Sequence, residues 1–295
     1  MADLEDNKIE LPGLWKASDA LSASSQRSFF RFKRAELGLL VLGALFGLIP
    51  TSCLFGVGPV LSILAFVAVV IIQLVGVVTK AESRWYDARA VAESIKSAAW
   101  QFAVGGEAFR IASPDAEAQF KDRLKGMLAN VPKLDLPPAA VSDSVITSWM
   151  RWMRSLPLAD RTRIYDRLRV EDQVSWYARK SKWNSRRRKL FSILTISVEA
   201  IAVVGGLLRL MFGFDLDLVG IFAAMAAGLI AWSQAKKYEF LAESYAVTSH
   251  EVRMVADTLS GLSSEGEWSQ AVHDAEAAFS REHTMWQARR QGPSA

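Results

Sequence analysis

Between Leu37 and Thr79 the chain runs for 43 residues without an Asp, Glu, Lys or Arg. A helix needs about 20 consecutive apolar residues to cross a bilayer, so this run is long enough for two crossings. Residues 49–51 (Ile-Pro-Thr) and 56–59 (Gly-Val-Gly-Pro) favour a turn between them. A single span would leave half of the run unexplained. The sequence therefore predicts a hairpin of two membrane-spanning helices.

A second apolar region covers residues 190–235 and is also long enough for two spans. It is interrupted at residues 212–217, where the sequence Phe-Gly-Phe-Asp-Leu-Asp favours a turn. Hydrophobic residues make up 51% of the chain, and their excess is concentrated in these two regions. We therefore predict an all-α membrane protein with four transmembrane helices in two hairpins, whose long helices extend into a cytoplasmic helical bundle. No segment carries a convincing strand pattern.

Basic residues gather where each predicted hairpin begins and ends, whereas the turn at 50–59 carries no charge. Lys and Arg are retained on the cytoplasmic side of membrane segments. We therefore expect a multi-pass protein of the inner (cytoplasmic) membrane, with both termini and the central segment 81–189 in the cytoplasm. The basic residues are Arg27, Arg31, Lys33 and Arg34; Lys80, Arg84 and Arg89; Arg179, Lys180, Lys182, Arg186, Arg187, Arg188 and Lys189; and Lys236 and Lys237.

A proline-rich stretch near the middle of the chain marks the predicted domain boundary. Pro137 and Pro138 are adjacent and together remove two backbone donors, which favours a linker over a helix. We predict an N-terminal two-span unit with cytoplasmic helices at residues 1–130, a linker at 131–141, and a C-terminal two-span unit with cytoplasmic helices at 142–295.

The cytoplasmic helices are predicted from their breakers and caps. We expect a lead-in helix at 11–32, with a cap at Ser18-Asp19 for part of it. Further helices are expected from residue 80 without a break to Gly105-Gly106, from Ser113-Pro114 to before Val131, over 142–154, over 160–189 into the third span, from the fourth span to about 259, and from a capping box at 264–267 to about 290.

The two halves of the sequence share one plan: a helix enters the membrane, turns, and leaves it again. Residues 26–30 and 173–177 precede the two hairpins, and Ala-Glu-Ser recurs after them at 92–94 and 242–244. Both predicted hairpins start and end on the same side, so the repeat is parallel. Inverted repeats with interrupted helices are a mark of transporters, and their absence makes transport a less favoured function.

Several short segments carry a resemblance to a known family. The clearest are Glu267-Trp268, Ala275-Glu276 and residues 280–290; residues 173–177, 84–86 and 92–96 add to it. On these segments the chain resembles a tandem pair of SLATT domains, the two-transmembrane-helix modules of prokaryotes. The resemblance implies a membrane effector of bacterial conflict systems that perforates or depolarises the membrane when triggered. It also implies partners that produce or sense a nucleotide signal.

Glu199 is the most informative polar residue because it lies about ten residues into the third predicted span. A carboxylate at the centre of a membrane helix costs about 3 kcal/mol, so it should face protein or water. One interpretation is a carboxylate that lines or gates a pore. The other is a protonated acid that forms a hydrogen bond with a neighbouring helix, to Gln73 or Ser197.

Four further polar residues of the predicted spans and turns are pore or gating candidates. Gln73 is the only strongly polar side chain of the second span and either forms a hydrogen bond within the bundle or contributes to ion selectivity. Arg209 either pairs with Asp215 or Asp217 at the outer turn, or extends to the interface. A selectivity ring at the pore mouth is the alternative for these charges.

Small and basic residues supply two other candidate sets. Gly43 and Gly47, and the stripe Gly220, Ala224 and Gly228, have the four-residue spacing that lets membrane helices pack closely. Glycine is also simply frequent in membrane helices. Arg281, Arg289 and Arg290 could contact an anionic ligand or headgroup, or serve structure alone. The tryptophans outside the spans are expected to pack in a helical core.

The sequence argues against an enzyme. His250, His273 and His283 lack the H-E-x-x-H spacing that places two metal ligands on one helix face. There is no G-x-S-x-G motif, no Gly-rich phosphate loop after a strand, and Cys53 is the single cysteine. We expect no metal and no cofactor. A net charge of +4 without long basic runs does not indicate a nucleic-acid partner.

Two apolar hairpins carry too few polar groups to enclose a wet pathway within one chain. We therefore expect a homo-oligomeric pore or membrane-disrupting effector in bacterial defence, gated by its cytoplasmic helices, with the lipid bilayer as one partner. The alternatives are a non-conducting membrane anchor or scaffold, and an ordinary ion channel unrelated to defence.

Overall fold

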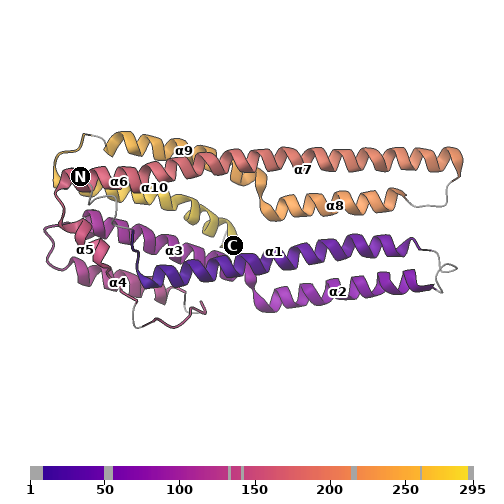
Figure 1. The fold of residues 1–295 in the computed structure, drawn as a ribbon, viewed down its shortest axis with the longest axis horizontal. Helices are drawn as coiled ribbons and strands as arrows, with labels where there is room; N and C mark the ends of the chain where they lie inside the picture. Colours follow the sequence, from indigo (N-terminus) through magenta and orange to yellow (C-terminus); the bar gives the residue numbers. More distant parts are fainter. Residues whose placement is uncertain are drawn as a thin grey trace. The chain divides into compact units, whose positions relative to one another are not determined.

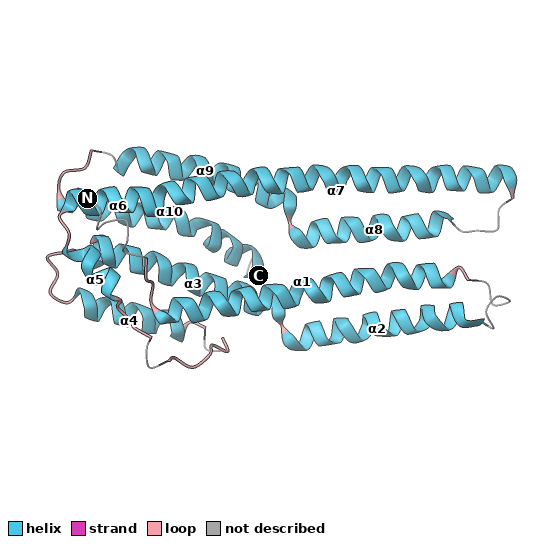
Figure 2. Ribbon diagram, in the orientation of Figure 1, coloured by secondary structure: helices cyan, strands magenta, loops and turns pink. Residues whose placement is uncertain are grey.

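The computed structural model describes residues 9–49, 56–131, 134–140, 143–213, 218–259 and 261–291, with side chains up to Phe279 in the last range. All regular elements in these ranges are helices (Figure 2). The chain divides into two compact units, and each draws on both halves of the sequence. Unit 1 comprises Met1–Ser25, Ser83–Arg179 and Ser244–Ala295, and unit 2 comprises Gln26–Glu82 and Lys180–Glu243.

Two long helices belong to both units without interruption. Helix α1 is Gly13–Gly47 and helix α7 is Glu171–Phe212 (Figure 1). The predicted lead-in helix and the start of the first predicted span are therefore one helix. The sequence suggested a helix cap at Ser18, and this prediction was wrong. Ser18 lies inside α1 with its side chain fully buried.

The helices that leave the two predicted hairpins are each divided in two. Helix α2 (Val57–Thr79) is followed by α3 (Ala81–Val104), and α8 (Leu218–Lys236) is followed by α9 (Tyr238–Leu259). The prediction of unbroken helices was wrong at these two points.

A single lysine in the left-handed conformation makes each break. Lys80 has φ 48° and Lys237 has φ 52°, a region that residues other than glycine rarely adopt. Each lysine is followed by a buried residue, Ala81 or Tyr238, and then by a glutamate in the first turn of the next helix. The two halves therefore repeat a specific backbone feature as well as a general plan.

In unit 2 the four helical segments pack through small residues and through an aromatic pair. Between α1 and α2, the Ser62 hydroxyl donates a hydrogen bond to the Gly43 carbonyl at 2.8 Å. Between α7 and α8, a Cβ built on Gly205 would lie 3.1 Å from the Leu218 side chain. Between α1 and α8, the rings of Phe30 and Trp232 are 5.9 Å apart in an edge-to-face arrangement.

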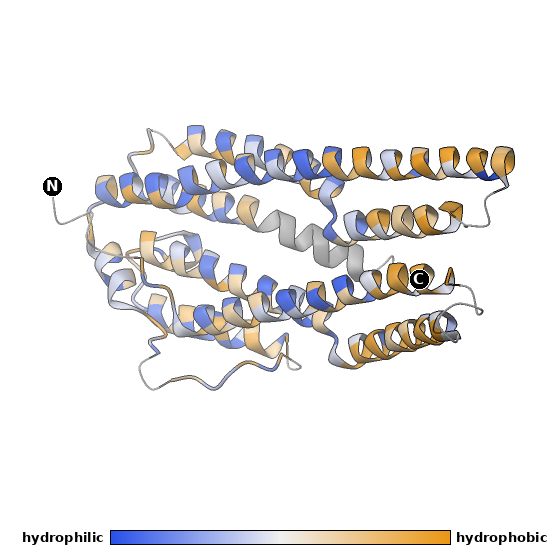
Figure 3. Ribbon diagram, turned by 45° about the vertical axis from the view of Figure 1, so that its right-hand side comes forward, coloured by the Kyte–Doolittle hydropathy of each residue, from blue (hydrophilic) through white to orange (hydrophobic). Residues whose placement is uncertain are grey.

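Unit 2 presents apolar side chains outward. Three helical stretches are long and apolar enough to cross a membrane by length and composition: Val57–Val104, Leu158–Phe212 and Leu218–Leu259. At most 11% of the apolar window of each stretch is buried in the chain, and Figure 3 shows the hydrophobic residues concentrated in α2, α8 and the second parts of α1 and α7. Soluble monomers rarely expose continuous apolar surface along whole helices. Helix α1 ends at Gly47, and residues 50–54 of the first predicted span lie outside the described ranges.

Unit 1 has a core of aromatic and aliphatic side chains. Trp100 of α3 packs edge to face on Trp149 at 5.0 Å and on Tyr165 at 5.7 Å, and Tyr165 packs in the same way on Trp268. Trp100, Trp149 and Trp268 are at most 3% exposed, which confirms the predicted role of these tryptophans in packing. The contributing elements include η3 (Glu107–Phe109), α4 (Ala116–Ala129), α5 (Ser148–Ser155), α6 (Leu158–Tyr165), the π-helical turn η4 (Asp166–Val170) and α10 (Glu265–Gln291).

Side-chain caps explain where two of these helices begin. Thr147 accepts a hydrogen bond from the Met150 amide and starts α5. Ser264 accepts one from the Glu267 amide at 3.3 Å and starts α10, as the capping-box pattern predicted. Helix α4 begins at Ala116, so the start predicted at Ser113-Pro114 was placed too early.

Gly105 ends α3 with φ +82°, and we expect Gly105→Ala to lower the free energy of unfolding by about 1–2 kcal/mol. An alanine Cβ there would also lie 2.8 Å from Ile111. Gly126→Ala is the matched control, because nothing lies within 4 Å of the added Cβ in α4. It should raise the free energy of unfolding by about 0.5–1 kcal/mol. Urea titration in detergent measures the free energy of unfolding of both variants. Equal effects of the two substitutions would contradict a strained left-handed conformation at Gly105.

Candidate functional site

Glu199 lies in the apolar part of α7 with an exposed side chain. Within the described part of the chain it makes no hydrogen bond and no ion pair. Its neighbours Ile196 and Val203, one helical turn away on either side, are 64% and 63% exposed. A single copy of the chain therefore leaves this carboxylate on an apolar surface.

Gln73 bonds to another acidic residue instead. Its Nε2 donates a hydrogen bond to Glu36 Oε1 at 3.2 Å, and Lys33 Nζ lies 3.0 Å from Glu36 Oε2. The proposed pairing of Gln73 with Glu199 is not formed. Sequence reasoning missed Glu36, although its position just before the apolar run and three residues after Lys33 favours an ion pair within the helix.

The remaining candidates of the apolar helices are placed only in part. Arg209 lies near the end of α7 with an exposed side chain, and Asp215 and Asp217 fall outside the described residues. Cβ atoms built on Gly43 and Gly47 would contact α2, 3.2 Å from Phe66 and 3.5 Å from Ser62. On α8, Gly228 faces Val41 of α1, Ala224 is half-buried and Gly220 is exposed. Arg281, Arg289 and Arg290 belong to α10, but their side chains lie outside the described part.

Unit 1 contains a buried ionic cluster that the sequence did not reveal. Arg169 of η4 donates from Nε to Glu276 Oε1 at 2.9 Å and from Nη2 to Glu276 Oε2 at 2.7 Å. The Tyr165 hydroxyl donates to the same Oε1 at 2.9 Å. Arg169 and Tyr165 are at most 3% exposed and Glu276 is fully buried. The two oxygens of one carboxylate therefore bring α10 and the α6–η4 segment together.

The protonation states of the cluster follow from its surroundings. Burial alone lowers the pKa of Arg169, but the charge and hydrogen bonds of Glu276 outweigh it and raise that pKa. Burial, reinforced by the charge of Glu276, raises the pKa of Tyr165 well above its ordinary value. Arg169 is therefore a permanent cation, and Tyr165 is a neutral donor.

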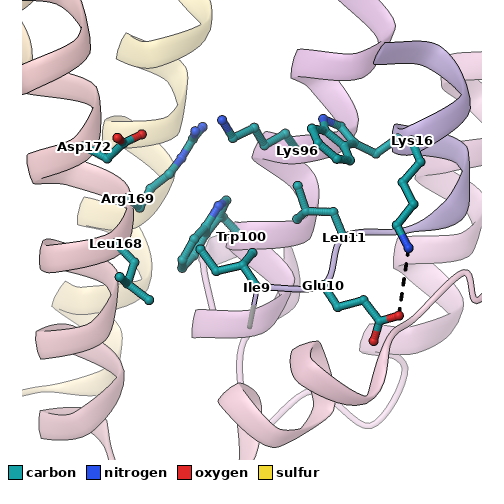
Figure 4. A pocket seen from close by; sticks show the side chains of 10 residues that line it. Ile9, Glu10, Leu11, Lys16, Lys96, Trp100, Leu168, Arg169 and Asp172 are labelled. Carbon is teal, nitrogen blue, oxygen red and sulfur yellow. Dashed lines mark ion pairs between the residues drawn. The ribbon is translucent and has the colours of Figure 1, made fainter. Parts of the chain in front are cut away.

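The third nitrogen of the same guanidinium, Arg169 Nη1, is buried and forms no hydrogen bond with the residues that the structure describes. Lys96 of α3 points toward it, as Figure 4 shows, and no hydrogen bond or ion pair of Lys96 is formed within the described residues. Burial lowers the pKa of Lys96, and the positive charge of Arg169 lowers it further. Two cationic side chains thus approach each other, of which Arg169 is paired with Glu276, while the nearby carboxylates of Glu93, Glu276 and Asp172 act on Lys96 in the opposite direction.

A cavity of about 650 Å³ lies beside these two side chains, entirely within unit 1. Its lining is amphipathic, with apolar side chains from the N-terminal segment, α3 and η4, and charged groups at its edges (Figure 4). Lys16 and Glu10, at one edge, face each other at 4.0 Å. The lining residues are Ile9, Glu10, Leu11, Trp15, Lys16, Lys96, Trp100, Leu168, Arg169 and Asp172.

One sequence signal could have revealed the cluster. On α10 the buried residues Trp268, Val272, Ala275 and Phe279 form an apolar stripe with helical spacing, and Glu276 lies on its edge. A glutamate in such a stripe requires a buried partner, because an isolated buried charge is costly. The partner itself, 107 residues away, could not be identified from spacing.

Comparison with known families assigns the two halves of the chain. Residues 12–162 match the family model described as SMODS and SLOG-associating 2TM effector domain 3. Residues 165–286 match the model described as SMODS and SLOG-associating 2TM effector domain 1. The chain belongs to the SLATT family. The resemblance inferred from short segments is thereby confirmed, including the tandem arrangement of two SLATT domains.

The SLATT assignment also gives the apolar helices a role. SLATT domains are two-transmembrane effectors associated with bacterial defence systems, so the exposed apolar surface of unit 2 belongs to a membrane protein. The boundary between the two SLATT matches falls after residue 162. The linker predicted at 131–141 stays a prediction. The chain matches no curated protein and no solved structure.

Proposed function

We propose that this tandem SLATT protein is an oligomeric effector of a bacterial defence system that opens or perturbs the cytoplasmic membrane. Four helices would cross the bilayer as two hairpins, with both termini and the central segment in the cytoplasm. The cytoplasmic helices would gate the pore in response to a nucleotide signal or to a partner that produces or senses one. Basic residues at all four flanks support this orientation.

The exposed carboxylate of Glu199 is the observation that carries the proposal. It lies between exposed apolar side chains of α7 and lacks any partner in the described part of the chain. Lipid is a poor environment for such a group, which costs about 3 kcal/mol at the centre of a span. Water in a pore, or a polar group from another copy, removes that cost. Both require several chains around a shared axis.

Replacing Glu199 by glutamine tests this assignment. In planar bilayers the purified wild-type protein should conduct, and a ring of carboxylates should favour cations. Glu199→Gln keeps the size of the side chain and removes its charge, so the cation preference should fall toward equal permeability. The measurement is the reversal potential in a salt gradient. Ser197→Ala, two residues away on the same helix, is the matched control and should leave the reversal potential unchanged.

The outcomes separate the candidate functions. Wild-type protein that reconstitutes fully without current would favour the non-conducting anchor. Currents that Glu199→Gln leaves unchanged in size and selectivity would reject the role of this residue. Growth arrest that depends on a phage or on a partner protein would distinguish a defence effector from an ordinary channel.

A further inference from the structure

We propose that the cavity beside Lys96 and Arg169 binds a small phosphorylated molecule, with its phosphate group between these two side chains. The proposal concerns unit 1 alone. It does not depend on pore formation, and binding can be measured without any membrane current.

The first step is a pair of positively charged donors with unused hydrogen-bonding capacity. Arg169 places two of its nitrogens on Glu276, and its buried Nη1 has no hydrogen bond to any described residue. The end of Lys96 points toward the same guanidinium from α3 (Figure 4). Two cations that face each other repel, and a buried donor without an acceptor is costly. An anion whose oxygens accept from both groups removes both penalties and forms charge-assisted hydrogen bonds.

The second step is the charge of the ligand. Five charged residues line the cavity, but Glu10 and Lys16 face each other at one edge. Asp172 lies near Arg169 at the other edge, and no ion pair joins it to Lys96 or Arg169 in the described residues. Arg169 already shares its charge with Glu276, so the end where Lys96 meets Arg169 offers a ligand the charge of Lys96 and the Arg169 Nη1 donor. The oxygens of one phosphate group can accept from both nitrogens and form charge-assisted hydrogen bonds.

The third step is the size of the ligand. A cavity of about 650 Å³ falls within the range of small-molecule sites and is much larger than a phosphate group. Leu11, Trp100 and Leu168 supply apolar surface to the remaining volume. The ligand therefore carries an apolar or aromatic part attached to its phosphate. This chemistry fits a water-soluble phosphate ester or the headgroup region of a phospholipid.

The local backbone supports a binding role. Arg169 lies in a π-helical turn, a distortion that is common at functional sites and that shifts the helical register. Tyr165, the last residue of α6, and Arg169 in η4 are four residues apart, and both donate to the Glu276 carboxylate. A ligand held by Lys96 and Arg169 would connect α3 with η4 inside unit 1.

The test is isothermal titration calorimetry on the full chain in a phosphate-free maltoside detergent. The probes are inorganic phosphate, adenosine 5′-monophosphate and a short-chain phosphatidic acid. At least one organic phosphate should bind saturably and more tightly than inorganic phosphate. Tighter binding of the adenosine ester identifies a soluble ligand, and tighter binding of phosphatidic acid identifies a lipid.

Two variants and one control decide whether the cavity is responsible for the measured binding of the phosphate compounds. Lys96→Met should weaken binding about tenfold or more, because it removes a charge-assisted hydrogen bond, and Lys96→Arg should restore most of it. Lys125→Met is the matched control, because Lys125 is 77% exposed on α4, away from the cavity lining, and pairs with Asp122. Absence of saturable binding below about 1 mM, or equal affinities of Lys96→Met and wild type, would overturn the proposal.

Discussion

Replacing Glu276 by alanine should lower the free energy of unfolding by about 3–5 kcal/mol. The substitution leaves Arg169 as an uncompensated cation that is 3% exposed, and it removes the acceptor of the Tyr165 hydroxyl. The measurement is a urea titration of the detergent-solubilised protein, followed by tryptophan fluorescence. Hydrogen exchange in α10 and η4 should rise in parallel, because both segments are held by this carboxylate.

An exposed ion pair of the same unit provides the control. Glu117 and Arg151 are joined at 3.0 Å, but their side chains are 47% and 55% exposed. Such pairs contribute at most about 1 kcal/mol, so Glu117→Ala should have a small effect. The double variant Arg169→Met with Glu276→Met should recover much of the stability that Glu276→Ala loses, since it removes both charges. A Glu276→Ala variant as stable as Glu117→Ala would show that the buried cluster does not stabilise unit 1.

Trp268→Ala should lower the free energy of unfolding by about 3–5 kcal/mol, the range observed for large aromatic side chains in cores. Trp268 is fully buried, packs on Tyr165, and donates from Nε1 to the Val104 carbonyl at 2.9 Å. The substitution removes the apolar contacts and one of the donors that satisfy the end of α3. Thermal unfolding in detergent, scanned with the wild type under the same conditions, measures the loss.

Two further substitutions separate the contributions at this position. Trp268→Phe keeps most of the ring volume and removes the donor, so its effect should fall between that of Trp268→Ala and that of the wild type. Met254→Ala is the control for loss of a large apolar side chain, because Met254 is 63% exposed on α9. If Trp268→Ala and Met254→Ala were equally mild, the aromatic core would not be a main source of stability.

The helical class and the membrane character were predictable because they follow from local patterns. The charge-free run from Leu37 to Thr79 and the capping box at Ser264 are each recognised within one continuous segment of the sequence. The breaks at Lys80 and Lys237 were not predictable in this way. Neither position has a Gly or a Pro, so the left-handed conformation depends on the packing of the residues that follow.

The partners of the buried Glu276 were out of reach for a different reason. Tyr165, Arg169 and Glu276 meet only after the segments before and after each hairpin have packed together. A hairpin returns the chain toward its starting point, so residues about 100 positions apart become neighbours. Sequence spacing carries no information on such pairs. The candidates at Glu199, Gln73 and Arg209 were selected by polarity within apolar runs, and their roles stay predictions.

The contrast between an unbroken helix and a broken one recurs in both halves of the chain. Helices α1 and α7 each run from residues of unit 1 into residues of unit 2 without a break. Helices α2 and α8 end just before Lys80 and Lys237, where one residue in the left-handed conformation separates them from α3 and α9. Each half of the chain therefore enters unit 2 through one continuous helix and leaves it through a helical path that is broken at a single lysine.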